Sequence, residues 1–570
     1  MLKTNFANYP KGPETCNNLN DLLGRGIFSV DGELWKLQRK VAIHEFTTRS
    51  LRSFMQQIVQ VELDTRLIPL LSHTCSAGVV VDLQDLLCRF TFDTICKLAL
   101  GVDPECLHIS LPAVEFAHAF DTATKISSSR FHTYPFIWRT LRALNVGSER
   151  KLREAIHQID EFAMSVIRKR KQQMQQQMDL LSRLLLLSFD ESKRSSSDVV
   201  TNDSATPPES RPETIFSDVF LRDIVISFVL AGRDTSSSVS QLQITSYFMG
   251  IMFLAANTDQ NLGDRSALCW STAAGISWFF WLLSRNRHVE DSIRAEIAEI
   301  VRSRNHHHRD HHVANNKKDT MSDTTTHTTT AAAADGELQK GNSTTIADWE
   351  KDEPAAAAAA ANPNIDMITS SKFTYEELKK MHYLDAAMTE SMRLYPPVPF
   401  DSKLAMEEDT WPDGTHIPKD SVVAYAPYAM GRMEQLWGSD CLEFKPERWL
   451  DDNGVFQPQS PYKYAVFQAG QRVCLGKELA MLQMKLLVAT LVSHFTISMS
   501  SSISATSEAA ADAQDAQDAQ DDDDDGGDDD DDFKPTYEIS LTLPIKNGLP
   551  VRIHLATQDD EDIKAKASKA

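Results

Sequence analysis

The chain has 570 residues, of which 42% are hydrophobic, and a formal net charge of −22 at pH 7. The apolar content is enough for one large core, and the negative charge argues against nucleic acid as a partner. The eight cysteines lie at scattered spacings without a C-x-x-C pair, which is unlike a disulfide framework and favours a reducing compartment.

The first part of the chain, residues 20–183, shows long amphipathic helical patterns with few glycines, most clearly over 148–177. Within it, Trp35 and Arg39 stand four positions apart, so both side chains would project from one face of a helix. By itself this signal is weak, because an aromatic residue and an arginine at this spacing are common on helix surfaces.

A second apolar helix is expected over residues 220–235, with Ala231, Gly232, Asp234 and Thr235 near its end. Residues 238–273 then break the helical periodicity with glycines and polar runs, and a helical pattern resumes over 276–302. Joining residue 237 directly to residue 274 would give one uninterrupted amphipathic helix. We therefore interpret 238–273 as an atypical insertion, either a retained intron or a loop that cuts the helix one turn after Thr235.

Three tracts are expected to be low-complexity or disordered inserts in a chain that otherwise forms one domain over 1–570, namely 191–212, 304–366 and 502–533. The second tract contains a histidine cluster at 306–308 and 311–312, for which we favour a solvated loop over a metal site. The third contains fourteen acidic residues between Glu508 and Asp532. We interpret it as a solvated loop, with docking or ion binding as the alternative.

Order is expected to return with a helix over 375–394, which the prolines at 396 and 397 would end. On this helix Glu390 and Arg393 are three residues apart and so share a face, and Arg448 follows downstream. A lone pair of this kind would be an exposed salt bridge of about 0.5 kcal/mol. Short strands over 415–429 and a hairpin-like pair around Asn547 and Gly548 make the predicted fold mainly α with minor β sheets.

The most informative segment places Cys474 between two glycines, Gly470 and Gly476, just before an apolar helix that we expect to start near Leu475. In a tight loop the backbone N–H groups can point at the sulfur, which lowers the thiol pKa and suits a thiolate metal ligand. The helix dipole acts in the same direction, and Arg472 offers a fork for an anionic group. The alternative is a buried core cysteine near a turn.

Phe467, Gly470, Arg472, Cys474 and Gly476 together follow the pattern F-x-x-G-x-R-x-C-x-G. This pattern resembles the haem-thiolate loop of the cytochrome P-450 superfamily. The resemblance implies the cytochrome P-450 fold, a haem b cofactor whose iron has Cys474 as its axial ligand, and a monooxygenase that uses dioxygen. With such a loop in the same chain, the other motifs acquire specific expectations.

By the same resemblance, Glu390, Arg393 and Arg448 would form a buried ion triad beneath the haem. Trp35 and Arg39 would hold haem propionates together with Arg472. Ala231 and Gly232 would let dioxygen lie against the helix backbone, while Asp234 and Thr235 relay protons to it. Relatives that rearrange peroxides without dioxygen often lack the threonine, so Thr235 favours a monooxygenase.

Four segments, 8–12, 21–32, 39–46 and 397–403, look most like the plant branch of the family that hydroxylates fatty acids at or near the terminal carbon. The implied electron source is NADPH, through a flavoprotein reductase that docks near the thiolate face. Two alternatives stay open. The substrate could be a hormone conjugate of the jasmonoyl-isoleucine type, or the chain could be a non-catalytic gene-model remnant, given its split oxygen helix.

Similar proteins also have an anchor helix, a hinge and the first sheet strands ahead of the segment that begins this chain, so we expect an N-terminally incomplete fold. No stretch approaches the roughly 20 apolar residues of a membrane span. The family resemblance implies the endoplasmic reticulum membrane. As written, the chain is expected to lack an anchor and to be cytoplasmic.

Overall fold

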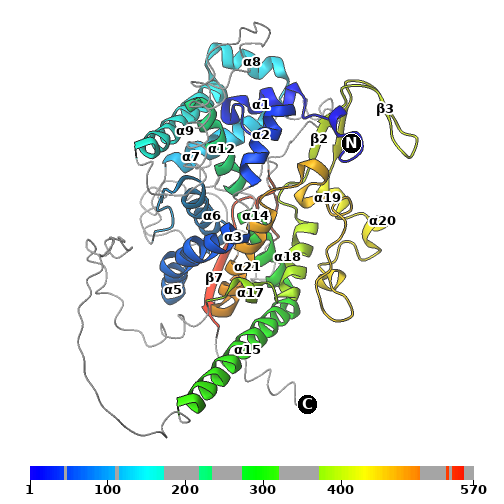
Figure 1. Cartoon of the computed structure of the whole chain (residues 1–570). Coiled ribbons are helices and arrows are strands. Elements are labelled where there is room, and N and C mark those ends of the chain that lie inside the picture. Colours follow the sequence, from blue (N-terminus) through cyan, green and yellow to red (C-terminus); the bar gives the residue numbers. More distant parts are fainter. Residues whose placement is uncertain are drawn as a thin grey trace, which may run out of the picture.

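The computed structural model of the chain describes residues 1–43, 48–108, 115–131, 133–172, 217–233, 272–319, 372–500, 534–537 and 542–556 (Figure 1). These residues are mostly helical, with small antiparallel sheets at the side and base of the helices. The prediction of a mainly α fold with minor β sheets is confirmed. No helix among these ranges is long and apolar enough to cross a membrane.

The first helices follow the amino-terminal segment in the sequence. Their bounds are η1 Phe6–Asn8, α1 Pro13–Leu23, α2 Gly32–Ala42, α3 Thr48–Phe54, η3 Met55–Val59, α4 Gln60–Glu62, η4 Leu63–Leu67, α5 Ile68–Ala77 and α6 Leu83–Leu100. The start of α6 is fixed by its N-cap Asp82, whose carboxylate accepts hydrogen bonds from the backbone N–H groups of Gln84 and Asp85. Gly78 and Gly101 end α5 and α6 in the left-handed conformation that glycine favours.

A second group of helices packs at the opposite end of the molecule from α15 (Figure 1). It comprises α7 Glu115–Ser129, α8 Pro135–Leu144, α9 Gly147–Gln172 and α12 Asp218–Arg233. Together with α1 and α6 they enclose a hydrophobic core that includes Phe120, Ile159, Leu221 and Leu230. The helices expected around 148–177 and 220–235 are therefore confirmed, with α9 described as far as Gln172 and α12 as far as Arg233.

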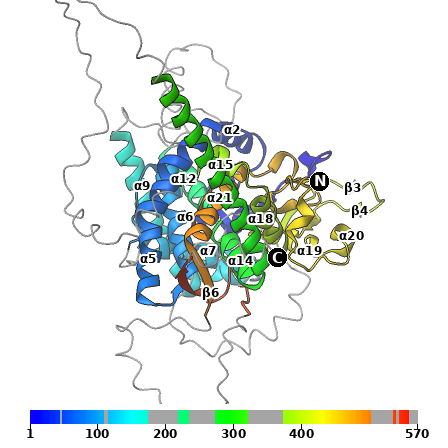
Figure 2. The same cartoon turned by 90° about the horizontal axis from the view of Figure 1, so that it is seen from below.

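The larger core lies between α6, α14 Thr272–Arg285, α15 Arg287–Asp319, α18 His382–Leu394 and α21 Lys477–His494 (Figure 2). Three predictions need correction here. The helix expected over 276–302 is two helices that meet at Asn286. The one expected over 375–394 is divided into α17 Tyr375–Leu378 and α18. The last helix begins at Lys477 and not near Leu475.

The predicted inserts fall mostly outside the described residues. This holds for 191–212 and 502–533, and for 238–273 except Thr272 and Ala273, which begin α14. The prediction of disorder over 304–366 is wrong for its first part, because α15 continues to Asp319. The rest of that tract lies outside the described ranges.

Three small sheets complete the described part of the fold. The first has the order β1 (Val81–Asp82), β7 (Pro550–Leu555), β6 (Phe495–Met499); the others pair β2 (Asp401–Leu404) with β5 (Val422–Tyr425) and β3 (Asp409–Thr410) with β4 (His416–Ile417), all antiparallel. The strands expected over 415–429 are β4 and β5, followed by helix α19 Pro427–Met430. Short helices fill the remaining segments, with α20 at Glu434–Trp437, η7 at Pro446–Trp449, η8 at Ala465–Phe467 and η9 at Gly470–Arg472.

The turn at Asn547 and Gly548 is present, and both residues have the positive φ values, 66° and 81°, that such a turn requires. It follows an isolated antiparallel bridge between Tyr537 and Ile545 and leads into β7. The predicted hairpin is thus confirmed only as a turn and one bridge, since β7 pairs with β1 and β6 instead.

Candidate functional site

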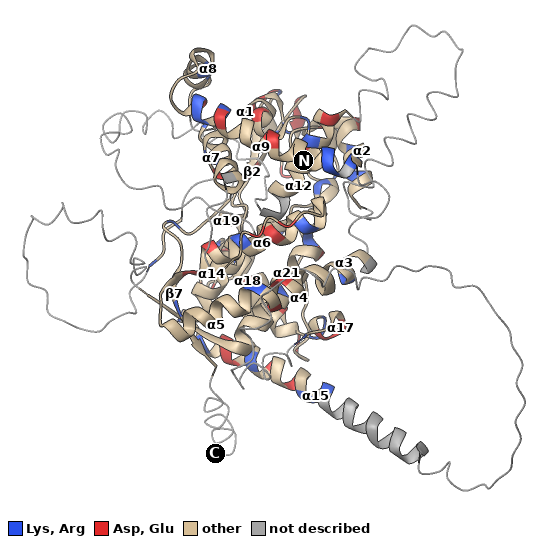
Figure 3. Ribbon diagram, turned by 90° about the vertical axis from the view of Figure 1, so that its left-hand side faces the viewer, with Lys and Arg blue, Asp and Glu red and all other residues tan. Residues whose placement is uncertain are grey.

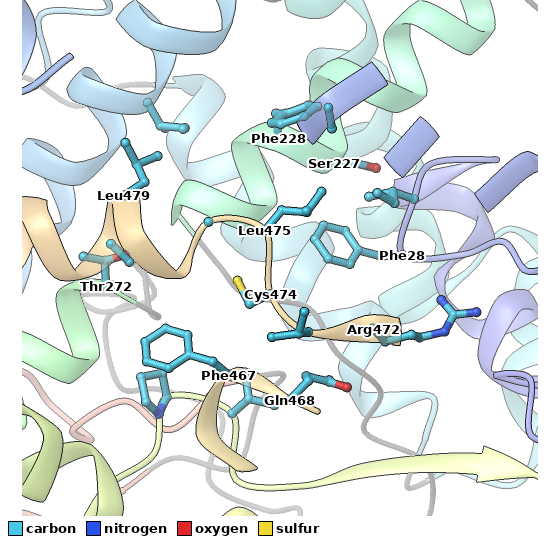
Figure 4. A pocket seen from close by; sticks show the side chains of 18 of the residues that line it. Phe28, Ser227, Phe228, Thr272, Phe467, Gln468, Arg472, Cys474, Leu475 and Leu479 are labelled. Carbon is cyan, nitrogen blue, oxygen red and sulfur yellow. The ribbon is translucent and has the colours of Figure 1, made fainter. Parts of the chain in front are cut away.

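Residues far apart in the sequence line one cavity of about 220 Å³. Its walls come from the loop around Cys474, from α2, α6, α12, α14 and α21, and from β2. Most of the lining side chains are apolar, among them Phe28, Phe228, Phe467 and Leu479 (Figure 4). A largely apolar space with a thiol in its wall suits a hydrophobic ligand held by a few polar groups.

The cysteine loop contains two single-turn helices, η8 and η9, that precede Cys474. The backbone N–H of Cys474 donates to the carbonyl of Phe467 at 2.9 Å, which closes the turn. Gly470 has a φ of 66°, and a Cβ atom there would lie only 1.8 Å from the carbonyl oxygen of Leu2, so glycine is required. In this loop the sulfur of Cys474 points into the cavity (Figure 4).

Burial raises the pKa of the Cys474 thiol, although the backbone N–H groups of Gly476 and Lys477 and the charge of Arg39 act in the opposite direction. The expectation that the loop lowers this pKa is therefore wrong in its net direction, because desolvation in an apolar cavity outweighs the loop's dipoles. A metal cation bound to the sulfur would reverse the balance. The site therefore fits a ligand that contains a metal cation able to bind the sulfur.

Two of the expected propionate residues are brought to one side of the cavity with Arg472. Arg39 donates to the carbonyl of Val473 at 2.8 Å, which ties α2 to the cysteine loop. The indole ring of Trp35 lies 5.5 Å from the guanidinium carbon of Arg39 and 4.5 Å from that of Arg472. Arg472 pairs with Asp31, and its buried Nε has no hydrogen-bond partner among the described residues. An unpartnered buried donor at the cavity edge fits an anionic ligand group.

Sequence reasoning missed two further cations in the wall, Lys11 and Lys403. Both lie in segments that were interpreted only as markers of a family branch. They come together because residues 8–10 run beside the end of β2, where the N–H groups of Leu404 and Met406 donate to carbonyls of that segment. No local pattern reveals this contact, since it joins residues about 400 positions apart.

Lys403 is held by an ion pair within β2, with its Nζ 2.8 Å from the carboxylate of Asp401. Tyr425 on β5 is also within 2.8 Å of Asp401. Lys11 instead donates from its Nζ to the carbonyl of Phe28 at 2.6 Å. Burial, together with the charges of Arg472 and Lys403, lowers the pKa of Lys11 to about 7.

The structure brings Glu390, Arg393 and Arg448 into one cluster. Arg393 donates to both oxygens of Glu390 at 2.7 and 2.8 Å, and Nε of Arg448 donates to the same carboxylate at 3.1 Å. The side chains of Glu390 and Arg393 are fully buried. Sequence reasoning missed a further donor, the indole N–H of Trp449 at 2.9 Å. With this many donors the buried carboxylate is well satisfied.

The remaining motif is described only in part. Ser227 and Phe228 on α12 line the cavity, and Thr272 at the start of α14 faces it from the other side (Figure 4). Ala231 and Gly232 lie in the last described turn of α12. Asp234 and Thr235 lie outside the described residues.

Comparison with known proteins gives a consistent family. The chain matches the model of the family described as Cytochrome P-450 over residues 1–248 and 359–509. It is 37% identical over 503 residues to cytochrome P-450 94C1 of Arabidopsis thaliana, which covers 88% of this chain and 77% of that relative. It is 36% identical over 503 residues to cytochrome P-450 94A1 of Vicia sativa, covering 87% and 73%. Identity to cytochrome P-450 86B1 of Arabidopsis thaliana is 37% over 497 residues, covering 87% and 70%.

Proposed function

The chain belongs to the cytochrome P-450 family, and we propose that it is a monooxygenase that hydroxylates fatty acids or related lipids at or near the terminal carbon. The observation behind this proposal is the apolar cavity into which Cys474 points, bordered on one side by buried cations. The family predicted from the motifs is confirmed, and with it a haem-thiolate enzyme that receives electrons from NADPH through a reductase.

When bound, haem b supplies the iron that activates dioxygen with those electrons. The sulfur of Cys474 would bind that iron, because it is the thiol that lines the cavity among the described residues. Trp35, Arg39 and Arg472 are proposed to hold the propionates at the cavity edge. Phe467, Gly470 and Gly476 shape the loop that presents the sulfur. Glu390, Arg393 and Arg448 stabilise the fold behind it.

The apolar part of the cavity wall supports a lipid substrate. Phe228, Leu479, Val398 and Ile95 offer apolar surface to an alkyl chain and exclude water from it. Asp234 and Thr235 directly follow the part of α12 that lines the cavity, and we propose that they deliver protons there. Ala231 and Gly232, one turn earlier, are proposed to leave room for dioxygen.

Two measurements test the proposal. The purified protein should show, in the reduced carbon-monoxide difference spectrum, the long-wavelength Soret band of a thiolate-ligated haem. Cys474→Ser should abolish this band, while Cys75→Ser, at a half-buried cysteine outside the cavity, should leave it unchanged. Failure to take up haem at all would overturn the enzymatic proposal and favour a non-catalytic remnant.

The substrate class is tested with a reconstituted reductase, NADPH and a panel of free fatty acids of different chain length. Products hydroxylated at or near the terminal carbon are the expected result. Turnover of a jasmonoyl-isoleucine conjugate in preference to every free fatty acid would contradict the fatty-acid assignment while leaving the monooxygenase class intact.

The flavoprotein reductase that supplies the electrons is proposed to dock on the side of the cysteine loop.

Helix α8 supports a location at the surface of the endoplasmic reticulum membrane. It projects at one end of the molecule (Figure 3), and Phe136 and Leu144 on it are 69% and 66% exposed. Arg139 on the same helix is exposed, whereas the half-exposed Arg142 is paired with Asp21. Exposed apolar side chains next to basic ones favour binding to an anionic lipid surface.

This location is tested by co-sedimentation with vesicles that contain an anionic phospholipid. The double variant Phe136→Ser, Leu144→Ser should lose binding. Val219→Ser, which removes an equally exposed apolar side chain from the start of α12, is the matched control and should bind as the parent chain does. Equal binding of the double variant and the parent would contradict the assignment.

A further inference from the structure

The four cationic side chains in the cavity wall differ in whether a carboxylate neutralises their charge. Arg472 is paired with the carboxylate of Asp31, and Lys403 with that of Asp401. Each of these two pairs is therefore close to neutral. Both carboxylates are held by further donors, the backbone N–H of Lys11 at 3.1 Å for Asp31 and the hydroxyl of Tyr425 for Asp401.

Within the described part of the chain, the side chains of Arg39 and Lys11 have backbone carbonyls as their only hydrogen-bond partners. Arg39 donates to Val473 and Lys11 to Phe28, and within the described ranges no carboxylate lies at ion-pair distance from either side chain. Lys11 is 6% exposed. A buried ammonium group without a counter-ion is unfavourable, since a carbonyl dipole compensates a full charge only in part.

This edge of the cavity therefore has two cationic side chains without a paired carboxylate among the residues described, Arg39 and Lys11. Of these, Lys11 can lose its charge by deprotonation. In a haem bound through a thiolate, the ferric iron, the macrocycle and the sulfur sum to zero, so the remaining charge is that of two propionates. The two uncompensated cations match two carboxylates in number. Lys11 lies on the segment before α1, and Arg39 lies on α2, where it contacts the ring of Trp35.

We propose that Lys11 and Arg39 are the two propionate counter-ions, and that Lys11 gains a proton when haem binds. This inference rests on the proposed function, because it presupposes a haem in the cavity. It refines the proposed function, in which Trp35, Arg39 and Arg472 hold the propionates. Lys11 and Arg39 would neutralise the propionate charges, whereas Arg472, whose charge Asp31 balances, would position a propionate by donating from its unpartnered Nε.

The surroundings of Lys11 support the proton step. The groups that face it are Arg472 and Lys403, which are positive, Asp31 and Asp401, which are negative, and the thiol of Cys16. The positive and negative charges around Lys11 nearly cancel, so burial is the main cause that lowers the pKa of Lys11 to about 7. At pH 8 the amine is then mostly neutral until an anion arrives, and an adjacent propionate returns its pKa to the usual range of lysine.

The proton count is measured directly. The holoenzyme is mixed with excess apomyoglobin in weak buffer, and the protons released per haem transferred are read with a pH indicator. Lys11→Arg keeps the positive charge in both states, so it cannot exchange this proton. At pH 8 the parent chain should release about 0.9 proton more per haem than Lys11→Arg, and at pH 6 about 0.1 more, as expected for a group with a pKa near 7.

Comparing two variants also removes the proton that Cys474 regains when its ligand bond breaks, because that step is common to both. The charge itself is tested by Lys11→Met, which should lose haem to apomyoglobin at least tenfold faster than the parent, while Lys11→Arg should stay within about threefold. Lys419→Met, at an exposed lysine paired with Glu407, is the control and should match the parent in both measurements.

The outcomes separate cleanly. Equal proton release by the parent and Lys11→Arg at pH 8, or unchanged haem loss in Lys11→Met, would overturn the inference. Neither result would affect the proposed function, as the holoenzyme would still show its thiolate spectrum. If Lys11→Met takes up no haem, the comparison between the parent and Lys11→Arg still decides the proton step.

Discussion

The guanidinium carbon of Arg472 lies 4.5 Å from the indole ring of Trp35, across the contact between the cysteine loop and α2. The same ring is 5.5 Å from the guanidinium of Arg39. One aromatic side chain therefore holds two cations near each other, which their repulsion would otherwise oppose. Cation–π contacts of this kind contribute about 0.5–2 kcal/mol.

Trp35→Leu should consequently speed the loss of haem to apomyoglobin by a factor of roughly 2 to 30, which is the kinetic equivalent of that energy. Trp35→Phe keeps an aromatic face and should fall between the parent and Trp35→Leu. Soret absorbance of the acceptor gives the rate. Identical rates for the leucine and phenylalanine variants would show that the aromatic face, and with it the cation contact, does not help to retain the haem.

Glu390→Gln should be strongly destabilising. The substitution leaves the guanidinium of Arg393, which is fully buried, without its carboxylate, at a cost of about 3–5 kcal/mol in the free energy of unfolding. Urea denaturation followed by circular dichroism measures it. Glu407→Gln, which breaks an exposed pair with Lys419, should cost less than about 1 kcal/mol. Similar losses in both variants would contradict a special role for the buried cluster.

Gly26→Ala should disturb the cavity through α12. A Cβ atom at Gly26 would lie 1.9 Å from the hydroxyl oxygen of Ser227, a cavity residue, and 2.8 Å from the carbonyl of Asp223. Overpacking of this size costs about 1–3 kcal/mol, and we expect a matching drop in thermal stability and in haem content. Adding Ser227→Gly should recover part of the loss.

The control for this prediction is Gly275→Ala on α14. A Cβ atom there meets Pro397 at an ordinary 3.4 Å. Alanine is also the better helix former, so the change should be neutral or stabilising by up to about 1 kcal/mol. A destabilisation by Gly275→Ala as large as that by Gly26→Ala would show that the close approach to Ser227 at Gly26 is not the cause.

Stability should also depend on pH through Asp93. Its carboxylate is fully buried and accepts hydrogen bonds from the N–H groups of Cys106 and Leu107 at 3.0 and 2.9 Å, and burial raises its pKa to about 6. The folded pKa thus exceeds the unfolded value of 3.8. Between these two values the folded state binds more protons, so this group's contribution to the free energy of unfolding falls as pH rises from about 4 to about 6.

Urea titrations at pH 4, 5, 6 and 7 should therefore show a declining difference in stability between the parent and Asp93→Asn, followed by a plateau above pH 6. The comparison uses the slope and not the absolute stability, because asparagine offers one acceptor where the carboxylate offers two. A pH-independent difference would mean that Asp93 titrates near its unfolded value.

Removal of residues 238–273 should leave haem binding intact. Helix α12 is described to Arg233 and α14 begins at Thr272, so the removal takes from α14 only Thr272, which lines the cavity, and Ala273. A direct join after residue 237 extends one apolar helical pattern into the next. The reduced carbon-monoxide spectrum of the shortened chain measures the outcome, and sequencing of transcripts for a junction between codons 237 and 274 addresses its origin. Loss of the Soret band on deletion would contradict this prediction.

Particular residues show how far sequence reasoning could go. The spacing of Glu390 and Arg393 fixes a shared helix face, so their pairing was accessible locally, whereas the indole of Trp449 joins them through tertiary packing alone. The loop around Cys474 was evident, yet the direction of its pKa depends on how deeply the cavity buries the sulfur. Lys11 and Lys403 were overlooked because only the contact between residues 8–10 and 404–406 brings them together.

The helix boundaries failed for a similar reason. Nothing in the amphipathic pattern over 276–302 marks Asn286 as a break, but its amide bonds to the carbonyl of Leu282 and so ends α14 where α15 must turn. Propensity alone does not detect a change of direction within one apolar pattern.

The order of strands in the first sheet has a consequence for how the chain is made. Strand β7 (Pro550–Leu555) lies between β1 (Val81–Asp82) and β6 (Phe495–Met499), which do not touch each other directly in the sheet order. During translation both outer strands emerge before the central one, and the earlier of them waits for most of the synthesis. The sheet therefore forms late in synthesis. A chain that ends before residue 550 has β1 and β6 without their shared partner β7, and unpaired strands of this kind are targets for chaperones and proteases.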